Sequence, residues 1–158
     1  FFLLILKKMK INIVRIDKTL DLPKYETEGS FAFDFLARQT KKINPGSLVL
    51  IPGNVIIECP QNLALQIIPR SSAYKKTGLF FPHSIGLIDA DYCGPEDEIM
   101  IQVLNLGNKS VTIQKGDKIA QGLFVQTQKV NFEEIEINKL SKKSRGGFGS
   151  TDKMTSND

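Results

Sequence analysis

Short apolar runs separated by turn residues dominate the hydrophobic pattern of this chain. Most runs are rich in Ile, Val and Leu, and Pro-Gly, Gly-Asn and Gly-Asp pairs lie between them, which is typical of strands joined by tight turns. A short helix is expected only near 71–76. Strands are expected at 10–16, 47–52, 54–59, 63–69, 99–106, 110–113 and 119–126. This pattern predicts an all-β antiparallel sandwich, jelly roll or barrel, because it leaves no room for crossover helices.

Composition limits the chain to one folded domain with a tail. The 158 residues are 41% hydrophobic and 24% charged, which is enough apolar surface for a single core. From Ser141 onward the sequence is rich in Gly, Ser and Lys, and we expect a flexible arm there. Met9 is the expected natural start, with residues 1–8 as an upstream extension. The predicted domain therefore covers residues 9–140 and the arm covers 141–158.

The N-terminal run and the cysteines bear on location. The apolar run FFLLIL is far shorter than the ~20 residues that span a bilayer, and positive charge follows it instead of preceding it, the reverse of a secretory signal. Cys59 and Cys93 lack a Cys-x-x-Cys spacing, which argues against zinc or a redox motif and favours buried thiols in a reducing compartment. We therefore predict a cytoplasmic protein with no membrane partner.

Charge and histidine content exclude further classes. The net charge is +4, yet the basic residues cluster near the two ends of the chain. A nucleic-acid groove needs basic residues spread over one face with aromatic residues between them, and no such stretch occurs, so no nucleic-acid partner is predicted. His83 is the one histidine, so a metal site built from several histidines is excluded by counting.

Two carboxylates, Asp89 and Asp91, flank one small residue and precede Tyr92. On a strand both would point to the same face, where two like charges are costly without partners. The segment is therefore either an Asp-rich turn or a functional site. As a site, one carboxylate near an aromatic ring suits a general base beside a sugar or base ring.

Four further stretches carry polar groups that strand packing does not explain. PRSSAYKKTG, at 69–78, presents Arg and Ser groups suited to an anion, or else a capped surface helix. KGDKIAQG, at 115–122, holds Gln121 in apolar surroundings. GGFGST, at 146–151, is either a plain linker or an arm whose glycine amides approach phosphates. Asp34, in the apolar run 29–37, needs a partner, which a hydrated metal would provide.

The chain resembles the trimeric dUTPase family in its motifs and in their order. The motifs that carry this resemblance are PRSS (69–72), GLIDADY (86–92), GDKIAQ (116–121) and GGFGST (146–151). The resemblance spans roughly residues 10 to 151. It implies a distorted jelly-roll β-barrel with a C-terminal arm, and hydrolysis of dUTP to dUMP and pyrophosphate. It also implies Mg²⁺ as cofactor and a homotrimer with shared active sites.

The resemblance also implies a role for individual residues. Asp89 would be the general base for water attack on the α-phosphorus, and Tyr92 would pack against the sugar and reject ribose. The hairpin 81–88 would read uracil through main-chain groups, and Asp34 would reach Mg²⁺ only through water, with no direct protein ligand. The substrate-binding residues implied are Arg70, Ser71, Ser72, His83, Gly86, Ile88, Tyr92, Gln121, Lys143, Arg145, Phe148, Gly149 and Ser150.

Some positions depart from the family pattern. The first motif reads FAFD, and His83 stands where the family often has Asn, so its role is either ligand contact or structural. Either Lys143 or Arg145 would serve as the cation for the γ-phosphate. The turn GPEDEI, at 94–99, is about two residues longer than usual in the family.

Two alternative functions are weighed against the hydrolase. A dCTP deaminase of the same superfamily needs a catalytic Glu where this chain has Gln102, which cannot shuttle a proton. A non-enzymatic nucleotide-binding regulator would be expected to lack Asp89 or Tyr92, and both are present.

Overall fold

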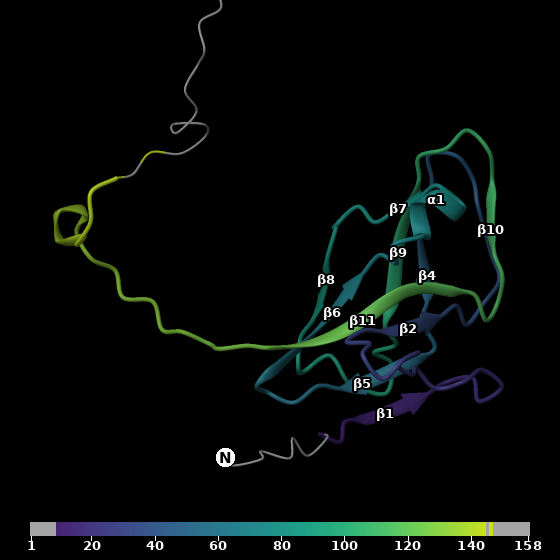
Figure 1. The fold of residues 1–158 in the computed structure, drawn as a ribbon, viewed down its shortest axis with the longest axis horizontal. Helices are drawn as coiled ribbons and strands as arrows, with labels where there is room; N and C mark the ends of the chain where they lie inside the picture. The colour runs from purple at the N-terminus through teal and green to yellow at the C-terminus, as the bar shows by residue number, and fades with distance from the viewer. Residues whose placement is uncertain (1–8, 145, 147–158) are drawn as a thin grey trace, which may run out of the picture. The chain divides into compact units, whose positions relative to one another are not determined.

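The computed structural model describes residues 9–144 and 146, and nearly all of the regular elements in them are strands (Figure 1). Contacts divide the chain into one unit that ends at Gln128 and a second that starts at Lys129. The strands are β1 (Asn12–Arg15), β2 (Phe33–Leu36), β3 (Lys41–Ile43), β4 (Leu48–Pro52), β5 (Val55–Glu58), β6 (Leu63–Ile68), β7 (Leu79–Phe80), β8 (Gly86–Ile88), β9 (Met100–Asn105), β10 (Val111–Ile113) and β11 (Lys118–Gln126). The helices are α1 (Ala73–Thr77) and the 3-10 turn η1 (Ile137–Lys139).

All strand pairs are antiparallel. A four-stranded sheet has the order β2-β11-β6-β8, a three-stranded sheet has the order β4-β9-β7, and two smaller sheets pair β1 with β5 and β10 with β3. Several neighbours in these sheets are distant in sequence, which is the arrangement of a jelly roll rather than of a simple meander. The predicted all-β class is confirmed.

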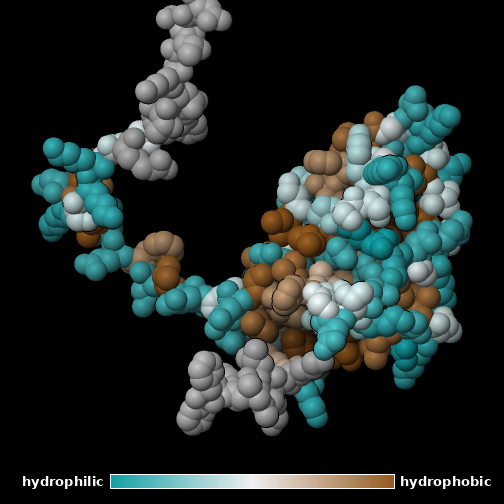
Figure 2. Space-filling view, in the orientation of Figure 1, coloured by the Kyte–Doolittle hydropathy of each residue, from teal (hydrophilic) through white to brown (hydrophobic). Residues whose placement is uncertain are grey.

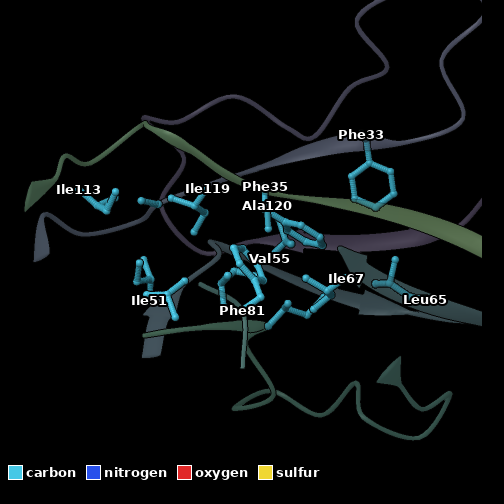
Figure 3. Close-up of a cluster of buried hydrophobic side chains, with 14 of the residues drawn as sticks. Phe33, Phe35, Ile51, Val55, Leu65, Ile67, Phe81, Ile113, Ile119 and Ala120 are labelled. Atoms are coloured by element: carbon cyan, nitrogen blue, oxygen red, sulfur yellow. The ribbon is translucent and has the colours of Figure 1, made fainter. Parts of the chain in front are cut away.

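The core lies between the sheets, and β9 is an example of a strand that turns alternate side chains inward. Along β9, Ile101, Val103 and Asn105 are buried while the residues between them are partly exposed. Phe35, Ile51 and other fully buried side chains meet these residues, and Figure 3 shows rings and branched aliphatic groups from several strands in one cluster. This packing fixes the strand ends from which the polar groups of the site project.

Four short strands were not expected from the hydrophobic pattern: β2, β3, β7 and β8. β2 is buried at three of its four positions, so it lacks the alternation that marks a half-exposed strand. β3 is mostly lysine, and β7 has only two residues. The expected helix at 71–76 is observed at Ala73–Thr77, where it ends at Gly78 with a left-handed φ of 68°.

The surface of the described residues is mostly polar, with separate apolar areas (Figure 2). Within the described ranges 9–144 and 146, no helix is long and apolar enough to cross a membrane. The second unit begins before Ser141, where the arm was predicted to start, and its described part has no strand.

Candidate functional site

Asp34 is the centre of a charged cluster where β2, β11 and β6 meet. Gln121 on β11 pairs with Asp34 on β2 and with Ile68 on β6, and Arg70 follows two residues after Ile68. Asp34 is only 6% exposed. Its Oδ1 accepts a hydrogen bond from Arg70 Nε at 2.9 Å, and its Oδ2 lies 2.9 Å from Lys118 Nζ. Both oxygens of this buried carboxylate are therefore paired with cations.

The cluster continues outward through Lys118. Its Nζ donates to Glu26 at 2.6 Å, and Arg70 also donates to the Lys118 carbonyl at 3.3 Å. The pKa of Lys118 is raised because both carboxylates favour the charged ammonium. The larger effect comes from the hydrogen bond to Glu26 and the next from that to Asp34. Sequence reasoning missed Lys118 and Glu26 as members of the site. Lys118 carried a signal, since it lies inside the stretch 115–122 that was singled out for Gln121.

A cavity of about 710 Å³ opens beside Arg70 and Ser71. Ser71 is exposed, and Ser72 sits at the N-cap of α1 without using its hydroxyl for a capping bond. The walls combine Arg70, Ser71 and Ser84 with aromatic and aliphatic side chains; the remaining lining residues are Pro69, Tyr74, Leu79, Phe80, Phe81 and Leu106. A space of this size, with a few polar groups on an apolar wall, fits a ligand the size of a nucleotide.

The segment 81–88, expected as a hairpin, is a turn followed by β8, which pairs with β6, whereas the preceding β7 pairs with β9. Ser84 takes a left-handed φ of 59°, and its N–H donates to the Phe81 carbonyl at 3.0 Å. A Cβ added to Gly86 would lie 3.2 Å from Cε1 of His83, so the imidazole packs closely against the backbone at Gly86. His83 is nonetheless exposed, and both of its predicted roles stay predictions.

Asp89 and Tyr92 lie in the turn that follows β8. Asp89 is exposed, and its carbonyl accepts a hydrogen bond from the Tyr92 N–H at 3.2 Å. The Tyr92 ring is 38% exposed, and its hydroxyl donates to the Glu98 carbonyl at 3.2 Å. In the longer turn that follows, Gly94 N–H donates to Asp97 Oδ2 at 2.7 Å, which closes the extra residues into a compact loop.

Within one chain, Asp89 lies far from the Arg70 cluster. β8 runs antiparallel to β6 with Ile88 beside Leu65, so Asp89 is level with Ala64, while Arg70 lies beyond the other end of β6. Six residues of extended chain span roughly 20 Å. The fold thus brings together Asp34, Arg70, Ser71 and Gln121 near one end of β6. It holds Asp89 and Tyr92, which follow β8, beside the opposite end of β6.

The C-terminal candidates fall largely outside the described residues. Arg145, Phe148, Gly149 and Ser150 are not described. Lys143 is exposed and belongs to the second unit. Over the described part of the chain, no three His, Cys, Asp or Glu side chains gather as a metal cluster.

Fold and site together define the class: an antiparallel jelly-roll protein with a nucleotide-sized cavity and a cluster of paired charges beside it. The family model described as dUTPase matches residues 18–152, and this chain belongs to that family.

Individual relatives agree with this assignment. The deoxyuridine 5'-triphosphate nucleotidohydrolase of Rickettsia prowazekii is 39% identical over 146 residues, covering 90% of this chain and 97% of that protein. The dUTPase of Staphylococcus bacteriophage 80alpha, solved with dUpNHpp, is similar with a TM-score of 0.79 at 20% identity, covering 91% and 99% of the two chains. A dUTPase mutant from phage phi11, solved with a structural Mg(II) ion, has a TM-score of 0.73 at 18% identity, covering 81% and 97%. The two phage structures establish the shared fold.

Proposed function

We propose that this protein hydrolyses dUTP to dUMP and pyrophosphate. The observation that carries the proposal is the family match over residues 18–152, which includes the exposed Asp89 and Tyr92 turn and the Arg70 cluster. The relative from Rickettsia is named for this activity and aligns over 97% of its length.

Asp89 is the proposed general base. Its carboxylate is exposed at the end of β8, where it accepts a proton from a water that attacks the α-phosphorus in line. The bond from the α-phosphorus to the bridging oxygen breaks, and pyrophosphate leaves. Tyr92, held beside Asp89, packs against the sugar and leaves no space for a 2'-hydroxyl.

The edge position of β8 supports uracil recognition by the main chain. β8 is the outer strand of the sheet β2-β11-β6-β8, so within the described residues it is paired only on the side of β6. Alternate N–H and C=O groups of its other edge point away from the sheet. Gly86 and Ile88 are the proposed positions that present these groups to the base.

The phosphate end is proposed to lie at the Arg70 cluster. Ser71 and Ser72 offer hydroxyls, Gln121 offers an amide, and Arg70 is held in place by Asp34. The arm is proposed to close over the whole ligand: Phe148 stacks on uracil, Gly149 and Ser150 cap the γ-phosphate, and Lys143 or Arg145 supplies a further cation.

Mg²⁺ is the proposed cofactor. Because both oxygens of Asp34 already accept from cations, this carboxylate fits a contact through water better than direct coordination. The triphosphate and water would therefore ligate the ion, which neutralises phosphate charge.

A homotrimer with shared sites is also proposed. A substrate cannot touch both Asp89 and Arg70 of one chain across roughly 20 Å of strand, so the two ends must come from different subunits. The outward face of the sheet β4-β9-β7 offers a contact surface, because its large apolar side chains are exposed: Leu48, Leu50, Phe80 and, just after β9, Leu106.

One assay tests the function. The protein is incubated with each deoxynucleoside triphosphate and Mg²⁺, and the products are separated. Release of dUMP and pyrophosphate from dUTP alone is expected. Conversion of dCTP to dUTP would instead identify a deaminase, and binding without turnover would identify a regulator.

A further inference from the structure

The hydroxyl of Tyr92 is anchored to a point that the rest of the fold holds rigid. Its acceptor is the Glu98 carbonyl, at 3.2 Å. The neighbouring Ile99 is fixed through both of its main-chain groups: its N–H donates to Val55 at 2.9 Å, and its carbonyl accepts from Gly53 at 2.8 Å. These bonds hold the acceptor for the Tyr92 hydroxyl from the side of Ile99.

The side chain of Glu98 adds a second lock. Its carboxylate accepts a two-pronged pair from Arg38, with Nε to Oε1 at 2.8 Å and a terminal nitrogen to Oε2 at 2.7 Å. Oε1 also accepts from the Asn54 N–H at 2.9 Å. The Arg38 and Glu98 side chains are only 25% and 12% exposed, so this geometry is shielded from solvent.

Asn54, in turn, is held in an uncommon conformation. It is 1% exposed with φ of 69°, and its side-chain amide accepts from the Asp17 N–H and donates to the Asp17 carbonyl. These bonds aim the Asn54 N–H at Glu98. The chain of contacts runs from Asp17 through Asn54 and Glu98 to the Tyr92 ring.

We infer that Arg38 and Glu98 are positioning residues that set the preference of this protein for deoxyribose over ribose, acting through the hydroxyl of Tyr92. This rests on the proposed function, in which the Tyr92 ring excludes a 2'-hydroxyl. A ring tethered at its backbone and at its hydroxyl cannot swing aside, so ribose is rejected by a rigid wall. Loosening either tether gives the ring room to move and admits UTP.

The test compares kcat/KM for dUTP and UTP in Arg38→Lys and Tyr92→Phe. Lysine keeps the charge but loses the two-pronged geometry, and phenylalanine keeps the ring but loses the bond. Each change should raise kcat/KM for UTP and lower the dUTP:UTP ratio by roughly threefold to tenfold, the size expected from one hydrogen bond. In the double variant the ratio should equal that of Tyr92→Phe alone, because both changes act through one bond.

Arg15→Lys is the matched control. Arg15 is a second half-buried arginine. Its guanidinium donates to the Leu20 carbonyl at 2.8 Å and makes none of the contacts that lead to Tyr92. The dUTP:UTP ratio of kcat/KM in Arg15→Lys should match that of the parent. Circular dichroism melting confirms folding, and Glu98→Gln replaces Arg38→Lys if the latter does not fold, with the same result required.

The outcomes separate the two ideas. A parent that does not hydrolyse dUTP contradicts the proposed function. If the parent hydrolyses dUTP and discriminates against UTP, the variants decide the positioning role. An unchanged dUTP:UTP ratio in either folded single variant, or additive effects in the double variant, overturns that role and leaves the proposed function standing.

Discussion

At the scale of single residues, the site depends on how this chain stabilises a buried carboxylate. Asp34 in an apolar strand would be costly alone, and Arg70 and Lys118 compensate its charge at 2.9 Å each. The same contacts hold the Arg70 side chain at the edge of the cavity. Asp89, in contrast to the buried Asp34, is exposed, so its carboxylate is accessible to water and to a ligand.

The first prediction concerns Asp89. Asp89→Asn should keep the fold and dUTP binding while lowering kcat by several orders of magnitude, because the amide cannot accept a proton from the attacking water. Asp91→Asn, also exposed in the same turn, is the control and should stay close to the parent. Turnover of Asp89→Asn within a factor of ten of the parent would rule out Asp89 as the base.

At the scale of elements, β11 organises the larger sheet. Its nine residues pair with β2 on one side and β6 on the other, and the register shifts between Lys118 and Ala120. Because of this bulge, the consecutive Ile119 and Ala120 are both buried, against the usual alternation. The irregular start of β11 thus supplies both core side chains and the cation that contacts Asp34.

Gly122 on β11 gives a second prediction. A Cβ there would lie 2.6 Å from Cζ of Phe33 and 2.8 Å from Cε2 of Phe35, two rings packed in the core. Gly122→Ala should therefore destabilise the fold by about 1–3 kcal/mol through overpacking. Gly29→Ala is the control, since nothing lies within 4 Å of a Cβ at that position. Urea unfolding measures both, and equal midpoints would contradict the packing argument.

A third prediction follows from the contact between the N-terminal segment and the turn before β11. The pKa of Asp17 is lowered from its ordinary value of 3.8 by hydrogen bonds to its carboxylate. The bond from Lys115 has the largest effect, and those from Thr19 follow. A carboxyl with a lowered folded-state pKa adds stability above its ordinary pKa, and that stability is lost as the pH falls below it. The stability difference between the parent and Asp17→Asn should therefore be present at pH 7 and shrink below pH 3.8.

Urea midpoints at a series of pH values test this dependence. Asp21→Asn removes an exposed carboxylate 3.8 Å from Lys24 and is the control. An Asp17→Asn difference that stays constant from pH 7 to pH 3 would contradict the assignment.

At the scale of the whole molecule, the proposed site depends on the proposed assembly. Asp89 and Arg70 lie at opposite ends of β6, and the proposed arm residues belong to a different unit of the chain. In the proposed homotrimer, each subunit would contribute a different part to each site, which would bring these groups together.

Mixed trimers test the shared-site proposal. Asp89→Asn protein and a protein lacking residues 142–158 should each be nearly inactive. After subunit exchange, the mixture should recover partial activity, because some sites then combine an intact Asp89 and an intact arm from different chains. The two proteins mixed without exchange are the control. An active monomer by light scattering, or no recovery in proven mixed trimers, would exclude shared sites.

The sequence by itself determined the strand-rich class and the position of the polar loops. Long apolar runs correctly predicted strands such as β6, β9 and β11, because one-sided burial leaves a local pattern of side chains. The motif stretches also identified the family. Cys59 is buried as expected, whereas Cys93 is only half-buried.

Only the tertiary structure decided which groups face one another. Asp34 meets Arg70 across 36 positions, and Arg38 meets Glu98 across 60. The pattern of burial records that a residue is inside, but not which distant side chain compensates its charge. The motifs implied that Asp89 and Arg70 act in a site shared between subunits, but only strand register sets their separation within one chain, beside opposite ends of β6.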